Sequence, residues 1–279
     1  MTPLRPIIIT DLFYKLDEKL IEVLKSLSPA DWNKQTIAPL WKVKDIAAHL
    51  LDTNIRTISS ARDGYTGEPP TGIHSYQDLI NYLNKLNADW VNAFKRASPG
   101  VLIELLALTG KQYCDCITLQ NPFDKAIYSV AWAGEEESEN WFHVAREYTE
   151  KWHHQQQIRL AVGKEAELYT REFYWPHLET SMRALPHHYH HVPANEGEAI
   201  KFVITGEGGG EWNLYHNGTG WLLVEEHAPN PLARIVIDGT IAWRLLTKGI
   251  SKAEARNHIS FAGNEEIGEK ILDMLAVMA

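Results

Sequence analysis

The chain has 279 residues, which exceeds the roughly 100–200 residues of a typical single domain and predicts two domains. Hydrophobic residues make up 44% of the sequence and charged residues 23%, values that exclude general disorder and are typical of a globular protein with a real core. The formal charge is −9 and no basic stripe is present, which argues against a surface that tracks nucleic-acid phosphates.

The first part of the chain is predicted to form four long helices. Leucine and valine recur at three- and four-residue spacing in residues 11–27, where Asp11 is the expected N-cap. Similar spacing predicts helices from residue 43 to 61, from 75 to 96 and from 138 to 162. Gly163 is expected to end the last of them. Four such helices favour a helical bundle.

The connection between the third and fourth predicted helices covers residues 98–137. It is longer than most loops, so it should hold some structure of its own. We predict a short helix over residues 102–110 and extended segments over 114–120 and 125–134.

After residue 165 the pattern changes to short runs bounded by Gly, Asn or Pro, which are typical of strands. A helical segment at 173–185 precedes predicted strands at 199–206, 211–217, 220–227 and 233–239. A helix at 240–249, a strand at 258–263 and a final helix at 265–278 follow. Strands grouped before helices indicate an α+β class. We therefore expect two domains, a bundle in residues 1–165 and a smaller α+β domain in residues 166–279.

No apolar run approaches the ~20 residues that a membrane helix needs. The apolar patch near the N-terminus is too short for a signal peptide and is broken by Asp11. We therefore expect a cytoplasmic protein that has no membrane partner. Cys114 and Cys116 are poorly spaced for a disulfide with each other, so reduced thiols are expected.

The stretch EKWHHQQQIRLAVGK, residues 150–164, places Glu150 and His154 one helical turn apart on the same face. His143 and Glu147 extend this polar stripe, whereas the opposite face carries Trp141, Ala145, Tyr148 and Trp152. The stripe can be the solvated side of the helix. It can also lie inside a bundle, provided that its groups are paired or bind a metal.

His49, in WKVKDIAAHLLD, falls on the predicted inner side of the second helix. One interpretation is a core histidine that donates to a backbone carbonyl. The other combines His49 with Glu150 and His154 into a set of nitrogen and oxygen ligands. Such a set suits zinc, or another divalent metal such as nickel, iron or manganese. Three protein ligands would leave one position open, as in catalytic sites.

Both segments resemble a known family. WKVKDIAAHLLD is similar to the Trp-x-Val-x-Asp-(Leu/Ile)-x-x-His-Leu pattern of the DinB-like superfamily, which ends in its first metal histidine. EKWHHQQQIRLAVG resembles the Glu-x-x-x-His-x-x-(Asp/Gln)-Ile-Arg-x-x-x-Gly segment of the mycothiol-dependent maleylpyruvate isomerase branch. The second half looks like the C-terminal domain of that branch, which is related to sterol carrier proteins. The resemblance therefore implies a DinB-like four-helix bundle followed by an α+β domain.

The resemblance also implies a site and a chemistry. It carries His49, Glu150 and His154 over as the three metal ligands, and gives His153 no ligand counterpart. The implied partners are a low-molecular-weight thiol and an electrophilic substrate, with a metal-bound thiolate as the nucleophile of an isomerase or a thiol S-transferase. Gln157 departs from the acidic residue common in that branch.

Other residues and functions remain open at this stage. Arg234 and Arg244 are candidates for holding a substrate carboxylate, by residue type. The alternative function is non-catalytic binding of a metal and an apolar ligand. The sequence is also compatible with a homodimer. A third interpretation is half of a two-metal site made by Glu147, Glu150 and His153. The histidines of HHYHH, 187–191, are predicted to be exposed, and residues 206–212 to form a hairpin loop.

Overall fold

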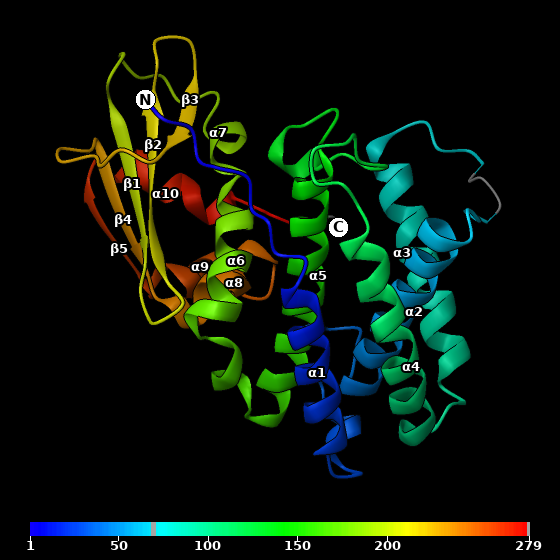
Figure 1. Ribbon diagram of the computed structural model, residues 1–279. Helices are drawn as coiled ribbons and strands as arrows, with labels where there is room; N and C mark the ends of the chain where they lie inside the picture. Colours follow the sequence, from blue (N-terminus) through cyan, green and yellow to red (C-terminus); the bar gives the residue numbers. More distant parts are fainter. Residues whose placement is uncertain (68–70, 278–279) are drawn as a thin grey trace. The chain divides into compact units, whose positions relative to one another are not determined.

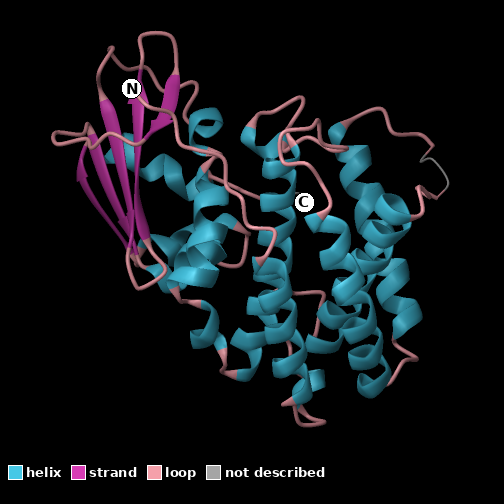
Figure 2. Ribbon diagram, in the orientation of Figure 1, coloured by secondary structure: helices cyan, strands magenta, loops and turns pink. Residues whose placement is uncertain are grey.

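The computed structural model describes residues 1–67 and 71–277, which fold into two compact units (Figure 1). The helical unit comprises residues 9–121 and 151–165. The mixed unit comprises residues 1–8, 122–150 and 166–277. The domain boundary expected after residue 165 stays a prediction. The class is α+β, as the sequence predicts: helices dominate the first part of the chain, and a five-stranded sheet with further helices follows (Figure 2).

The helical unit is built from α1 (Leu12–Lys25), α2 (Val43–Thr57), α3 (Tyr76–Phe94), α4 (Pro99–Thr118) and the second half of α5 (Asn140–Val162). Side-chain caps begin two of these helices: Ser75 accepts a hydrogen bond from the Asp78 amide, and Ser98 from the Val101 amide. A π-helical turn, Ile58–Arg62, continues α2. Within the described ranges, no helix combines the length and apolarity that crossing a membrane requires.

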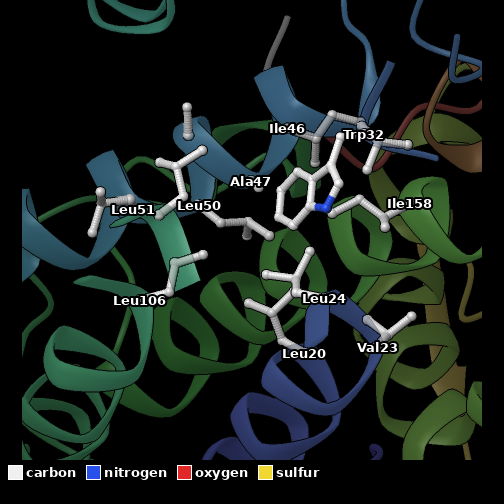
Figure 3. Close-up of a cluster of buried hydrophobic side chains, with 13 residues drawn as sticks. Leu20, Val23, Leu24, Trp32, Ile46, Ala47, Leu50, Leu51, Leu106 and Ile158 are labelled. Atoms are coloured by element: carbon white, nitrogen blue, oxygen red, sulfur yellow. The ribbon is translucent and has the colours of Figure 1, made fainter. Parts of the chain in front are cut away.

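Apolar stripes from these helices meet in one buried cluster (Figure 3). α1 contributes Leu20 and Leu24, and α2 packs on both α3 and α4. Burial of each such side chain stabilises the fold by roughly 1.5–3 kcal/mol. The members from α2, α4 and α5 are Val43, Ile46, Ala47, Ala48, Leu50, Leu51, Leu102, Leu106 and Ile158.

The connection after α3 corrects one prediction. α4 runs without interruption to Thr118, so residues 114–118 are helical and the predicted extended segment is wrong there. The reason is non-local, because Leu106, Tyr113 and Ile117 of this helix are buried and α4 packs on α1 and α2. Residues 125–134 contain a bridge from Lys125 to Glu139 and a short 3₁₀ turn, Ala131–Ala133.

The mixed unit centres on a sheet with strand order β3-β2-β1-β4-β5. The strands are β1 (Ala199–Ile204), β2 (Gly210–His216), β3 (Trp221–Val224), β4 (Ala233–Ile237) and β5 (Ile259–Gly263). β1 and β4 pair in parallel, and the other pairs are antiparallel. All five predicted strands are present, and the loop between β1 and β2 confirms the hairpin expected at 206–212.

Helices complete the mixed unit. α6 (Arg171–Met182) and α7 (Leu185–His188) precede the sheet, and α8 (Gly239–Leu246) and α9 (Lys252–Arg256) connect β4 to β5. α10 (Glu265–Glu269) packs on β4 and β5 and is followed by a 3₁₀ turn, Lys270–Asp273. The final helix expected at 265–278 is therefore shorter, and residue 278 lies outside the described residues.

A substitution at Gly239 tests how closely the start of α8 packs on the backbone that follows β1. A Cβ at this position would lie 2.1 Å from the backbone carbonyl oxygen of Thr205, an atom that cannot swing away. We expect Gly239→Ala to lower the free energy of unfolding by roughly 1–3 kcal/mol. Gly220→Ala is the control, because among the described residues nothing lies within 4 Å of its added Cβ. Urea unfolding followed by tryptophan fluorescence measures both, and equal stability of the two variants would contradict the expectation.

Candidate metal centre

His49 lies on α2 and is 8% exposed. Its ring centroid is 4.7 Å from that of His154 on α5, and the two rings meet edge to face at 74°. The Trp41 ring lies 4.7 Å from the His49 ring and 5.8 Å from the His154 ring. The structure thus brings His49 and His154, 105 positions apart in the sequence, into one aromatic cluster inside the helical unit.

One turn of α5 supplies the remaining donors. The ligand atoms of Glu150, His153 and His154 all lie within 4.8 Å of one another. His153 and His154 are buried, whereas Glu150 is partly exposed. His153, which the family pattern sets aside, is therefore part of the cluster. Its signal in the sequence is the Glu-x-x-His spacing, because residues three apart on a helix are neighbours.

The protonation of His49 suits a ligand. Burial lowers the pKa of this imidazole well below its ordinary value, and the neighbouring His154, Arg56, His153 and Lys151 lower it further. His49 is therefore neutral at neutral pH and keeps a lone pair. Its buried Nδ1 has no hydrogen-bond partner among the described residues. The core-histidine alternative requires the imidazole to donate to a backbone carbonyl, and Nδ1 of His49 makes no such hydrogen bond.

His154 is oriented by Gln157. The two side chains are 3.0 Å apart, between Nδ1 and Oε1. Since an amide oxygen only accepts, Nδ1 carries a proton, and in the neutral imidazole Nε2 is then the nitrogen with the lone pair. Neutral imidazoles together with one carboxylate form a donor set that fits zinc or another divalent first-row metal. The residues present therefore fit the metal that the sequence patterns imply.

The rest of the predicted polar stripe is engaged elsewhere. Arg146 donates from Nη2 to His143 Nδ1 at 2.8 Å and to a Glu147 carboxylate oxygen at 2.7 Å. His143 is 6% exposed, and Tyr148 on the other side of α5 is fully buried. The polar stripe is thus not a solvated face. Because they share the stripe with Glu150 and His154, the sequence also predicts His143 or Glu147 as an outer-shell partner of a metal, and this stays a prediction.

A second polar cluster lies beside these donors in the helical unit. Lys151 is buried, donates to Asn54 Oδ1 and lies 4.1 Å from the centre of the Tyr113 ring. It lines a cavity together with Asp17 and Cys114. Burial raises the pKa of the Cys114 thiol to about 12, so this side chain stays a protonated thiol. Both cysteines are free and buried, as expected.

The remaining candidates belong to the mixed unit. Arg234 is exposed on β4, and Arg244 on α8 lies 3.8 Å from a Glu254 carboxylate oxygen. Their proposed role in holding a carboxylate stays a prediction. In the HHYHH run, His187, His190 and His191 are exposed. The run is anchored by His188, whose Nε2 donates to the Lys270 carbonyl at 2.7 Å, and by Tyr189, which is fully buried.

Comparison with known proteins places this geometry in context. Residues 13–159 match a family model described as the mycothiol maleylpyruvate isomerase N-terminal domain. A histidine-to-alanine mutant of the mycothiol-dependent maleylpyruvate isomerase is similar in structure, with a TM-score of 0.50 and 10% sequence identity over 91% of each chain. The unmutated enzyme gives a TM-score of 0.49 at the same identity and coverage. At this identity the likeness shows the fold alone. A search of curated proteins finds no match.

Asp17 makes the stability of the helical unit depend on pH. Burial raises the pKa of its carboxyl to about 6, against an ordinary value of about 3.9. A raised folded-state pKa favours the protonated form, so this contribution to stability is fully present below about pH 4 and is lost as the pH rises through 6. We expect Asp17→Asn to remove this loss. Above pH 7 its free energy of unfolding should exceed that of the wild type by up to about 3 kcal/mol.

Chemical unfolding at several pH values between 4 and 8 measures this effect. The difference between the two proteins should grow across the window from pH 4 to 6. Asp63→Asn is the control, because its carboxylate is exposed and ion-paired with Arg62. A difference between Asp17→Asn and wild type that is constant with pH would show that Asp17 ionises normally in the folded protein.

Proposed function

Because the chain belongs to the mycothiol maleylpyruvate isomerase N-terminal domain family, we propose that it is a metal-dependent enzyme of thiol chemistry. It would be a maleylpyruvate isomerase-like enzyme or a thiol S-transferase. One observation carries the proposal: within the family-matched residues, the ring of His49 meets that of His154, whose ligand atom clusters with Glu150 and His153. The clustered ligand atoms are those of Glu150, His153 and His154, and His49 joins them through its ring contact with His154.

His49, Glu150 and His154 would hold the metal, with zinc the first choice for two imidazoles and one carboxylate. Such an ion supplies Lewis-acid chemistry, which stabilises the thiolate of a thiol whose free pKa of about 8.5 leaves little nucleophile at neutral pH. A low-molecular-weight thiol of the mycothiol kind is the proposed cosubstrate. The family match supports this choice of thiol.

The protein side chains prepare the site for this chemistry. The Trp41 ring packs against both imidazoles and helps to exclude water from them. Gln157 fixes the proton of His154 on Nδ1, so that Nε2 presents a lone pair. Glu150 is the partly exposed member of the cluster, which makes its side the route by which a small molecule would approach.

The proposed reaction begins when the thiol loses its proton to solvent. The thiolate then adds to one carbon of an activated double bond, forming a C–S bond as the π electrons move toward the electron-withdrawing group to give an enolate. In an isomerase, the remaining single bond rotates, the enolate electrons re-form the double bond as the C–S bond breaks, and the departing thiolate takes a proton back from solvent. In a transferase the enolate carbon takes up the proton instead, and the sulfur stays bound to carbon. We propose Arg234 or Arg244 as the partner of a substrate carboxylate.

The two-metal interpretation has less support. It needs Glu147 as a ligand beside Glu150 and His153. Glu147 is instead ion-paired with Arg146 at 2.7 Å and lies outside the cluster of ligand atoms found in the described residues.

Metal content tests the proposal. We expect wild-type protein without a tag to hold about one equivalent of a divalent metal, measured by inductively coupled plasma mass spectrometry. His49→Ala, Glu150→Ala and His154→Ala should each lose most of it, because a three-donor site does not survive removal of a donor. His74→Ala is the matched control, since His74 is exposed and outside the cluster. Metal-loaded wild type should then isomerise maleylpyruvate, or conjugate a simple electrophile, only when a thiol is added.

Two other results would change the conclusion. If folded wild type holds no metal, or if the three variants retain the metal, the proposal of a metal-dependent enzyme at this site is wrong. Stoichiometric metal without thiol-dependent turnover would favour the non-catalytic binding protein. His190→Ala and His191→Ala identify metal held by the exposed HHYHH run, because only such metal would fall in those variants.

His153 distinguishes a three-donor from a four-donor centre. If His153 only packs on His154, with ring centroids 4.0 Å apart, His153→Ala should keep stoichiometric zinc and lower its affinity less than tenfold, an effect smaller than those typical of outer-shell partners. Competition with a chromophoric chelator measures the affinity. A loss comparable to that of His154→Ala would instead show a fourth ligand and a closed resting site.

A further inference from the structure

The two edges of the sheet differ in how they are covered. At one edge the N-terminal segment lies along β3: Pro3 forms a bridge with Val224, and the Glu225 amide donates to the Thr2 carbonyl at 2.9 Å. At the other edge, β5 has only β4 as a neighbour among the described strands (Figure 1). Proteins block open edges with charged residues, proline or a covering segment, because unpaired backbone groups can pair with another strand. β5 (Ile259–Gly263) contains no charged residue and no proline.

The register of β4 and β5 shows which backbone groups of β5 face the open edge. The His258 carbonyl accepts from the Asp238 amide at 3.0 Å, and the Asn264 amide donates to the Leu232 carbonyl at 2.7 Å. Hydrogen-bonded residues alternate along an antiparallel strand, so the even-numbered positions of β5 face β4. Phe261, the middle residue of the strand, therefore directs its amide and its carbonyl toward the edge. Within the described ranges neither group has a hydrogen-bond partner.

We propose that this edge is a dimer interface, where β5 of one copy pairs antiparallel with β5 of a second copy across a two-fold axis at Phe261. In this register the two Phe261 residues exchange N–H···O=C hydrogen bonds, and Ile259 lies opposite Gly263 of the second copy. Because a two-fold axis relates identical surfaces, each strand supplies the partners that the other lacks. The two five-stranded sheets then form one continuous sheet.

The side chains of β5 allow a second strand to approach. Successive side chains point to opposite faces of a sheet, so Ser260 and Ala262 share one face. Both are small and exposed, and in the proposed register Ser260 lies opposite Ala262 of the second copy. Phe261 is half-buried on the other face, where its ring would lie beside the Phe261 ring of the second copy. Aromatic pairs across neighbouring strands stabilise sheets.

The charges at the ends of β5 favour a second copy as the partner. The chain carries a formal charge of −9, so two copies repel each other unless local charges compensate. Arg256 precedes β5 and Glu266 follows it, and antiparallel pairing brings the start of one strand beside the end of the other. Opposite charges therefore meet at both ends of the paired strands. Arg256 already contacts Glu265 and Glu269, and Glu266 is exposed, with no ion pair in the described part of the chain.

Sedimentation velocity of the full chain over a concentration series tests the proposal. Two short strands bury less than the roughly 1,200–2,000 Å² of a stable interface, so the dimer should be weak. We expect the mass of wild type to rise from that of one chain toward twice that value as the concentration increases.

A pair of charges on β5 should abolish this rise. In the variant that combines Ser260→Glu with Ala262→Glu, each new carboxylate would lie opposite a carboxylate of the second copy, which destabilises the pairing. This variant should stay a monomer at every concentration. Its fold should be kept, because both positions are exposed and position 262 lies opposite Arg234 of β4 in the same chain. Circular dichroism checks the fold.

A variant that combines Asn84→Glu with Ala88→Glu is the control, because it adds the same charge at exposed positions of α3, in the helical unit. It should dimerise as wild type does. If wild type stays monomeric at every concentration, the proposal is wrong. A dimer that survives in the β5 variant would also overturn it, because the contact would then lie elsewhere.

Disulfide formation tests the register. In the proposed pairing, positions 260 and 262 of different copies form a non-hydrogen-bonded pair with Cα atoms about 4.5 Å apart, which a disulfide can span. A mixture of Ser260→Cys and Ala262→Cys proteins should therefore form a covalent dimer faster than either variant alone at the same total concentration. The native Cys114 and Cys116 are buried. Equal rates in all three samples would contradict pairing about Phe261.

Discussion

The structure depends on one constraint: α5 is a polar helix segment that the fold buries. Residues 151–159 are buried without interruption, although they include a lysine, two histidines, three glutamines and an arginine. Polar groups taken out of water destabilise a protein unless hydrogen bonds replace those lost to solvent. The neighbouring helices must therefore supply partners along the length of this segment.

Long side chains meet this requirement by reaching backbone carbonyls of distant elements. Arg159 donates to the Lys19 carbonyl at 2.9 Å, and Gln156 to that of Glu165 at 3.0 Å. Lys151 reaches α2 through Asn54. These bonds fix how α5 is rotated about its axis, so the same packing that satisfies the polar groups also aims His154 at His49. Stability and the geometry of the candidate centre thus have a common origin.

The sequence predicted those helices and strands whose spacing of apolar residues is set within the element itself. Amphipathic spacing located α1, α2 and α3, because each carries apolar residues along one face, although Val91 is the one fully buried residue among those described in α3. Short apolar runs located all five strands. It failed at residues 114–118, where packing of α4 on α1 and α2 decides the conformation. It left the polar stripe of α5 open between solvent and core, since the answer depends on helices far away in the chain.

The donors of the candidate centre likewise fall into those that local spacing predicts and those that it does not. The spacing of Glu150 and His154 is local and visible in the sequence. The combination with His49 was one of two open interpretations, and family resemblance favoured it. His153 was set aside because it has no ligand counterpart in the family pattern, and adjacent helical residues point about 100° apart. In the structure the rings of His153 and His154 nevertheless lie 4.0 Å apart, so side-chain torsions bring together what the helical wheel separates. Spacing alone cannot predict such torsions.

Burial has a further chemical consequence for histidines in this protein. It lowers the pKa of both His49 and His143, so both imidazoles are neutral at neutral pH. A metal ion competes with protons for the lone pair of an exposed histidine, and this competition weakens binding as the pH falls. In a buried cluster the fold has already removed the proton. The desolvation that makes α5 difficult to bury is thus also what leaves His49 ready to bind a cation.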